Sequence, residues 1–325
     1  MSIELSVLLI TYNNELHIRE TLDSLVQQSC DFNFEIAVGD DKSTDKTFEI
    51  IRAYATEYPG LFNIQQNRSQ LGILGNLKTT LDRCNGRLIF NFDGDDIVKS
   101  KEALQKFVDT FKQKPEIGFV DSGYDRLLNE ENKIIPFSNR SSIFASKETY
   151  KNLIKLGQVI PVGMCFKKDL IYQYVDFDYY MGQNITIEDY PILVDMVMHC
   201  DFERIEESLH IYRVHSSSYS HKKSFERIYF LNNQMLKLFN HFHKKYHFSK
   251  SLVETYVETH HKSVLFNAGK YENKNAGRES FNSIKNKSIR DYIHYWASQY
   301  PIVGRLIRLK KAFYSVLKKS LGSRM

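Results

Sequence analysis

The sequence up to residue 96 alternates short apolar runs with segments in which apolar residues recur at helical spacing. The runs predict β-strands at residues 6–10, 34–38, 62–64 and 88–92. The segments between them predict helices at residues 16–28, 43–58 and 72–84. Strand–helix alternation with short connections is typical of an α/β fold with a parallel sheet. We therefore expect a Rossmann-like, mostly parallel sheet flanked by helices.

Three of the predicted strands run directly into polar segments. These segments are Thr11–Glu15, the pair Asp40 and Asp41, and the acidic turn Asp93–Asp96. In open α/β sheets, ligands bind outside the carboxyl ends of the strands. We expect the three segments to converge on one crevice.

The acidic turn places Asp93, Asp95 and Asp96 within four residues, with Gly94 between the first two. Carboxylates so close together repel one another, so a cation is expected to neutralise them. Oxygen ligands of this kind suit Mg²⁺ or Mn²⁺, and glycine lets the backbone turn tightly. The alternative is a solvated acidic turn, because an isolated Asp-x-Asp is common by chance.

Charge is unevenly distributed along the 325 residues. The net charge is +5, but residues 301–325 contain seven Lys or Arg and no acidic residue, so the preceding 300 residues are slightly acidic. This distribution argues against a nucleic-acid-binding protein. The four cysteines have no metal-type spacing, and free thiols in a reducing compartment are expected. Neither a signal peptide nor a transmembrane run is expected, which favours a cytoplasmic location.

The pattern changes after the first two-thirds of the chain. Further helices and strands are expected up to about residue 214, and residues 138–145 have little pattern and could form a loop over the site. From residue 224 onward, apolar residues follow helical spacing alone. We expect three regions: an α/β domain at residues 1–222, a helical region at 223–300, and a basic amphipathic helix at 301–325.

Five motifs in order resemble those of the family 2 glycosyltransferases with the GT-A fold. They are Thr11-Tyr12-Asn13, Asp40-Asp41 with Ser43-Thr44-Asp45, the Asp93/Asp95/Asp96 cluster, Glu188-Asp189-Tyr190, and Tyr212-Arg213-Val214-His215. The resemblance covers about residues 4–220. Each motif is weak alone, whereas five in the family's order are specific. Lys42 departs from the Gly or Asn that is more usual after the Asp pair, but it leaves both carboxylates in place.

The resemblance implies a nucleotide-diphosphosugar donor, Mn²⁺ or Mg²⁺, and inverting transfer of the sugar to an acceptor hydroxyl. UDP is the commonest donor nucleotide in similar enzymes. Asp189 matches the family's catalytic base, which would take the proton from the acceptor hydroxyl. The structural alternative is that Asp189 only caps a helix, within a capping box formed by residues 186–189.

The resemblance also assigns the remaining site residues. The metal would be held by Asp95, Asp96 and His215. Asp41 would accept a hydrogen bond from the nucleobase, or else serve only as a turn or helix-start residue. The full set expected to contact the donor is Thr11, Tyr12, Asn13, Glu15, Asp41, Gly72, Asn76, Asp93, Asp95, Arg213 and His215.

Other classes of protein remain open at this point. A nucleotide-sugar binder without turnover is the main alternative, although it would not need the base Asp189. A phospho-acceptor receiver domain is about half as long and expects a lysine at a later strand end. A membrane-attached scaffold would depend only on the tail.

The basic tail at residues 301–325 predicts an amphipathic helix suited to an anionic membrane surface. In a helix, one face carries Ile302, Leu306, Leu309, Phe313, Val316 and Leu317, and the other carries Arg305, Arg308, Lys311, Lys318 and Lys319. The alternative is that its apolar face packs on the catalytic domain. We expect a protein held peripherally on the inner face of the cell membrane, acting on a glycan or lipid-linked glycan acceptor in cell-surface polysaccharide synthesis.

Overall fold

The computed structural model describes residues 2–137, 146–215 and 224–304. The chain divides into two compact units, residues 1–218 and 219–325, and each is described by itself. We call the first the N-terminal unit and the second the helical unit. The N-terminal unit contains β1 (Leu5–Thr11), α1 (Ile18–Val26), β2 (Phe34–Asp40), α2 (Thr47–Glu57), β3 (Phe62–Gln66), α3 (Gly72–Arg83), β4 (Leu88–Asp93), β5 (Ile97–Val98), α4 (Ala103–Gln113), β6 (Phe119–Leu128), β7 (Lys133–Ile135), α5 (Lys147–Lys155), β8 (Met164–Lys167), α6 (Lys168–Tyr174), α7 (Phe177–Gly182), α8 (Asp189–His199) and β9 (Phe202–Val214).

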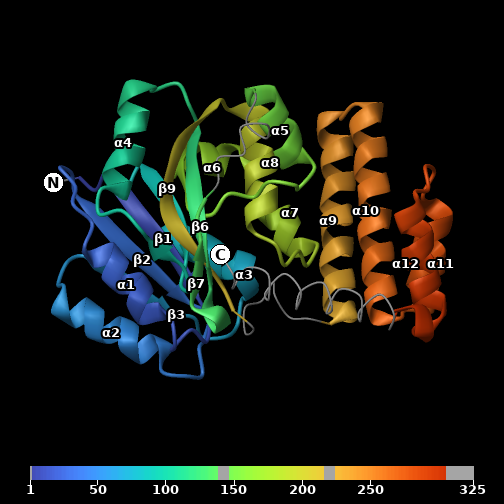
Figure 1. Cartoon of the computed structure of the whole chain (residues 1–325). Helices are drawn as coiled ribbons and strands as arrows, with labels where there is room; N and C mark the ends of the chain where they lie inside the picture. The colour runs from blue at the N-terminus through green and yellow to red at the C-terminus, as the bar shows by residue number, and fades with distance from the viewer. Residues whose placement is uncertain (1, 138–145, 216–223, 305–325) are drawn as a thin grey trace, which may run out of the picture. The chain divides into compact units, whose positions relative to one another are not determined.

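These strands form one mixed nine-stranded sheet (Figure 1). Its order is β3-β2-β1-β4-β8-β6-β9-β5, and β7 pairs with β6. Strands β3, β2, β1 and β4 are parallel, as the alternating pattern predicts. Strand β8 is antiparallel to both β4 and β6, while β9 is parallel to β6. The ends of β6 and β9 therefore reach the same edge of the sheet as the ends of β1, β2 and β4.

The core follows the two-residue period of the central strands. On one face of the sheet, Leu5, Val7 and Leu9 of β1 belong to an apolar cluster with side chains of α1, α2 and α4. On the other face, Leu8 lies with Leu77 of α3 and with apolar residues of α6 and α8. A strand whose residues are buried on both faces appears in the sequence as an unbroken apolar run, which is why β1 was predicted.

The helical unit contains α9 (Phe225–Tyr246), α10 (Lys250–Tyr271), α11 (Lys274–Ser283) and α12 (Ile289–Gln299). Helix α10 packs against α9, α11 and α12. Three of the helices have a side-chain N-cap, with Ser224, Ser249 and Asn273 each accepting a backbone N–H from the first turn. No helix within the described residues is both long enough and apolar enough to cross a membrane.

Several short elements were not predicted from the sequence, namely α5, α6, α7 and the two-residue strand β5. Short helices carry too few apolar positions to show a period. The patternless segment 138–145, the predicted boundary near residue 222 and most of the predicted tail helix lie outside the described residues. The three-region division remains a prediction. All four cysteines are free thiols.

Candidate active site

The acidic turn lies at the carboxyl end of β4, against the end of β1. The N–H of Gly94 donates to the carbonyl oxygen of Ile10 at 3.0 Å. A Cβ on Gly94 would lie 2.6 Å from Oγ1 of Thr11, so glycine alone lets the turn approach β1 this closely. The Thr21 hydroxyl donates to the carbonyl oxygen of Gly94 at 3.1 Å and ties the turn to α1.

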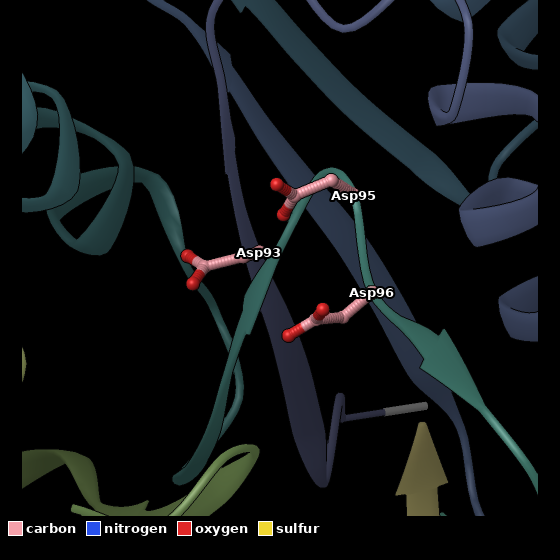
Figure 2. Close-up of side chains that lie close together, drawn as sticks. All are labelled: Asp93, Asp95 and Asp96. Atoms are coloured by element: carbon pink, nitrogen blue, oxygen red, sulfur yellow. The ribbon is translucent and has the colours of Figure 1, made fainter. Parts of the chain in front are cut away.

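Figure 2 shows that the carboxylates of Asp93, Asp95 and Asp96 extend to the same side of this turn. One oxygen from each lies within 4.8 Å of the others. Burial raises the pKa of Asp93 and of Asp96, and the charge of Asp95 raises both further. Three carboxylates so placed offer the oxygen ligands that a hard divalent cation prefers, and such a cation would offset their mutual repulsion.

Arg213 fixes the acidic turn through both its side chain and its backbone. Its Nε donates to the carbonyl oxygen of Asp95 at 2.8 Å, and its backbone N–H donates to Oδ1 of Asp96 at 2.8 Å. The two terminal nitrogens bind Asn129 at 2.9 Å and Glu20. Arg213 is only 3% exposed. The side chain expected to meet the diphosphate or metal is thus engaged with protein acceptors from three elements.

His215 lies directly beside the acidic turn. Its Nε2 is 2.9 Å from Oδ2 of Asp95, and the side chain is buried. The ring of His17 packs against it, with ring centroids 4.5 Å apart. Burial lowers the pKa of His17, and the charges of Arg213 and His215 lower it further. His17 therefore adds a second imidazole to this wall of the site.

Asp189 is the first residue of α8, and the helix start has no side-chain N-cap hydrogen bond. The N-cap is Glu188, which makes no side-chain cap hydrogen bond, and Oγ1 of Thr186 has no partner in the part of the chain that the structure describes, so the capping box that was the alternative for residues 186–189 is not formed. Oδ1 of Asp189 accepts the N–H of Tyr190 at 2.6 Å. Burial raises the pKa of Asp189, and its charge in turn raises the pKa of Asp93.

Asp189 also lines a small, largely apolar hollow together with Asn91 of β4. Oδ1 of Asn91 is buried and has no hydrogen-bond partner among the described residues. Glu188 is almost fully buried, and burial followed by the charge of Asp189 raises its pKa. A carboxylate in such surroundings holds a proton more readily than one in water.

The end of β1 lies beside the end of β2, as the sequence predicts. Thr11 is in register with Asp40, and the N–H of Asp41 donates to the carbonyl oxygen of Thr11 at 2.9 Å. Oγ1 of Thr11 accepts from Nδ2 of Asn14 at 3.1 Å. Tyr12 is 45% exposed, so its ring is available to a ligand at this edge.

The loop after β1 is hydrogen-bonded to the segment that precedes α2. Asn13 has a φ of +51°, its N–H donates to Oγ of Ser43 at 2.9 Å, and its Oδ1 accepts from the N–H of Thr44 at 2.8 Å. The carboxylate of Glu15 accepts from the N–H of Lys46 at 3.0 Å. In this arrangement Asn13 and Glu15 shape the loop.

Asp41 holds the segment that leads into α3. Its Oδ1 accepts from Nδ2 of Asn67 at 3.0 Å and from the N–H of Leu71 at 2.7 Å, while Oδ2 accepts from the N–H of Gly72 at 3.0 Å. Gly72 has a φ of +74°. The helix-start role is therefore present, and it leaves acceptor capacity on Oδ2 for a nucleobase.

Asn76 is buried behind this segment. Its Nδ2 donates to the carbonyl oxygen of Gly39 at 2.8 Å, and its Oδ1 accepts from Asn67 at 2.9 Å. The expected polar neighbour of the donor thus supports the end of β2.

Sequence reasoning missed four residues of the site: His17, Glu20, Thr21 and Asn129. The first three lie on or just before α1, in a segment whose sequence shows helical spacing and no motif. Asn129 directly follows β6. Only the shared sheet edge brings α1, β4, β6 and β9 together, and no local pattern reports that proximity.

A family model described as Glycosyl transferase family 2 matches residues 6–174, just over half of the chain, and the chain belongs to this family. Poly(ribitol-phosphate) beta-glucosyltransferase of Bacillus spizizenii is 25% identical over 217 residues, which cover 58% of this chain and 34% of that protein. The chain spans about a third of the length of the first curated relatives it matches.

Solved structures show the same fold. The 1-349 fragment of S. aureus TarS in complex with UDP-GlcNAc matches with a TM-score of 0.53 and 17% identity, covering 95% of this chain and 92% of that one. The mannosyltransferase PcManGT from Pyrobaculum calidifontis, in complex with GDP-Man and Mn²⁺, matches with a TM-score of 0.57 and 16% identity, covering 97% and 81%. At these identities the likeness concerns the fold, which is GT-A, as the motifs predict.

Proposed function

We propose that this chain transfers a sugar from a nucleotide-diphosphosugar to an acceptor hydroxyl, with inversion at the anomeric carbon. The observation that carries the proposal is the meeting of the acidic turn, His215 and Asp189 at one edge of the sheet. Asp189 lies close enough to Asp93 for its charge to raise the Asp93 pKa. The proposed metal site and the candidate base are thus neighbours, as transfer chemistry requires.

The residues at the turn fit a divalent metal. Carboxylate oxygens from Asp95 and Asp96 and the imidazole of His215 form a donor set suited to Mn²⁺, with Asp93 beside them. When bound, such an ion would offset the negative charge that develops on the departing nucleoside diphosphate. Family membership and a fold neighbour that binds Mn²⁺ support a divalent metal. Mg²⁺ would serve the same role.

Asp189 would act as the base. An acceptor hydroxyl is a poor nucleophile until its proton is removed, and the raised pKa of a buried carboxylate makes it a better proton acceptor. The hydroxyl oxygen would then attack the anomeric carbon as the bond to the diphosphate oxygen breaks. Tyr12 and the end of β2 would contact the nucleotide, with Oδ2 of Asp41 accepting from the base.

UDP is our choice of nucleotide. TarS, a fold neighbour, binds UDP-GlcNAc, and the sequence relative named above is a glucosyltransferase that acts on poly(ribitol phosphate). We infer a cell-surface polymer or a lipid-linked glycan as the acceptor. We also propose a peripheral position on the inner face of the cell membrane, supported by the basic composition of residues 301–325.

A screen of nucleotide-sugars for Mn²⁺-dependent hydrolysis tests the proposal, because glycosyltransferases slowly transfer sugar to water. We expect release of UDP from one UDP-sugar, and its loss after chelation. If the protein binds UDP but releases no UDP from any nucleotide-sugar, even with candidate acceptors present, it is a non-catalytic binder instead.

A further inference from the structure

Helix α12 exposes most of its large apolar side chains. The side chains buried against the rest of the helical unit are Asp291, Ala297 and Ser298. The opposite side carries a continuous stripe of exposed apolar and aromatic residues. We define the α12 stripe as Ile289 (81% exposed), Tyr292 (48%), Ile293 (42%), Trp296 (48%) and Tyr300 (53%). Their spacing of three and four residues places them on one face of the helix.

The packing of α12 fixes the stripe outward. Asp291 completes a capping box by accepting from the backbone N–H and the hydroxyl of Ser288, both at 2.7 Å. A Cβ on Gly269 of α10 would lie 2.7 Å from the carbonyl oxygen of His294, so the two helices touch through their backbones. Rotating α12 to bury the stripe would force bulky rings into this contact. The exposure of the stripe is therefore built into the packing of α10 against α12.

The surroundings of the stripe are basic. Arg290 is exposed in the first turn of α12, and Lys287 and the exposed Lys285 precede the helix. Lys285 also forms a surface ion pair with Glu254 at 3.5 Å. Residues 224–304 as a whole carry 12 Lys or Arg and only six Asp or Glu. The chain continues from α12 into residues 301–325, which contain no acidic residue. A partner of this surface should therefore combine negative charge with an apolar phase.

We propose that the α12 stripe inserts into the interfacial layer of an anionic lipid bilayer. Trp and Tyr favour the level of the lipid headgroups, while aliphatic side chains such as Ile289 and Ile293 enter the acyl boundary. Nucleic acid would not take up isoleucine side chains, and a second positively charged copy would be repelled. The proposal concerns an observed helix face and is separate from the tail helix expected at 301–325. It does not depend on the transfer reaction.

Trp296 is the only tryptophan of the chain, so its fluorescence reports on the stripe alone. The experiment uses the full-length protein, without nucleotide, and vesicles of phosphatidylglycerol or of phosphatidylcholine. With phosphatidylglycerol we expect a blue-shifted emission and quenching by lipids brominated on the acyl chain, both reversed by high salt. With phosphatidylcholine we expect little change.

Two matched variants sharpen the test. Ile289→Ser combined with Ile293→Ser keeps the fluorophore and should weaken vesicle binding about tenfold or more, because two apolar side chains leave the membrane. Ile134→Ser changes an isoleucine of β7 that is 51% exposed, and should bind as the parent does. Circular dichroism establishes that both variants are folded.

Two results would overturn the proposal. Binding to phosphatidylglycerol without any quenching of Trp296 would show that another segment makes the contact. An emission shift that grows with protein concentration in the absence of vesicles would assign the stripe to contact between copies. Because no sugar donor is present, neither result bears on the proposed transfer reaction.

Discussion

The N-terminal unit and the helical unit place their polar residues in opposite ways. In the first, buried polar groups such as Asp96, Arg213 and Asp41 gather at one edge of an apolar sheet. In the second, α12 buries Asp291 and exposes Trp296. The charge follows the same division, since residues 1–218 carry 23 basic and 33 acidic side chains while residues 219–325 carry 21 basic and six acidic. The first arrangement suits a small ligand that carries charge, and the second suits a broad anionic surface.

The largest effect should come from Asp189→Asn. An amide cannot take the acceptor proton, whereas it keeps the size of the carboxylate and an oxygen for the N–H of Tyr190. We expect the transfer rate to fall about 10²- to 10⁴-fold with UDP affinity unchanged. The measurement is a steady-state transfer assay beside calorimetric titration of UDP. Asp178→Asn, at an exposed carboxylate of α7, is the control. Transfer within about threefold of the parent would leave Asp189 a purely structural residue.

Arg213→Lys should have the next largest effect. Lysine cannot reach the Asp95 carbonyl oxygen, Asn129 and Glu20 together, so the acidic turn would lose its fixed position. Groups that orient metal ligands typically contribute 10- to 100-fold to metal affinity, and we expect a loss of that size for Mn²⁺. Calorimetric titration with Mn²⁺ measures this affinity.

The control for that variant is Arg204→Lys, which disturbs a buried ion pair with Asp121 elsewhere in the same unit. It should lower the free energy of unfolding while leaving Mn²⁺ affinity as it is. Equal losses of affinity in both variants would mean that Arg213 acts through general stability rather than through the turn.

A smaller effect tests the packing of the helical unit. Gly269→Ala places a Cβ 2.7 Å from the carbonyl oxygen of His294, a backbone atom that cannot move away easily. Alanine normally favours a helix, yet here we expect the free energy of unfolding to fall by about 1–3 kcal/mol. Gly182→Ala, where no atom lies within 4 Å of the added Cβ, should cost little.

Ile293→Ser completes this comparison, because an exposed side chain contributes little to folding. We expect its free energy of unfolding to stay within about 0.5 kcal/mol of the parent. All of these stabilities come from denaturant unfolding followed by circular dichroism. A large loss for Ile293→Ser would show that the stripe is covered within the protein.

The two units also differ in how far their sequences could be interpreted. At the sheet edge, the resemblance of the motifs to a known family placed His215 with the carboxylates of the acidic turn. The role of Arg213 could not be predicted, because its acceptors Glu20 and Asn129 come from elements distant in sequence. The antiparallel pairing of β8, β7 and β5 could not be predicted either, because a sequence pattern reports periodicity and not pairing partners.

In the helical unit, the sequence predicted helices but not which face of each is buried. A hydrophobic stripe is normally assigned to the core. Helix α12 reverses that rule because the close approach at Gly269 and the capping by Asp291 decide its orientation. Such packing depends on a partner helix and leaves no local pattern.

The central claim is that the acidic turn binds a divalent metal together with the donor diphosphate. Calorimetric titration of UDP, with and without Mn²⁺, tests it most directly in the parent protein and in Asp95→Ala and Asp96→Ala. A bound Mn²⁺ would offset the charge of the diphosphate by several kcal/mol, so we expect Mn²⁺ to strengthen UDP binding in the parent. Because each variant removes a metal ligand, each should lose about 100-fold or more of that affinity. UDP binding that is independent of Mn²⁺, or that is as tight in both variants as in the parent, would contradict the account.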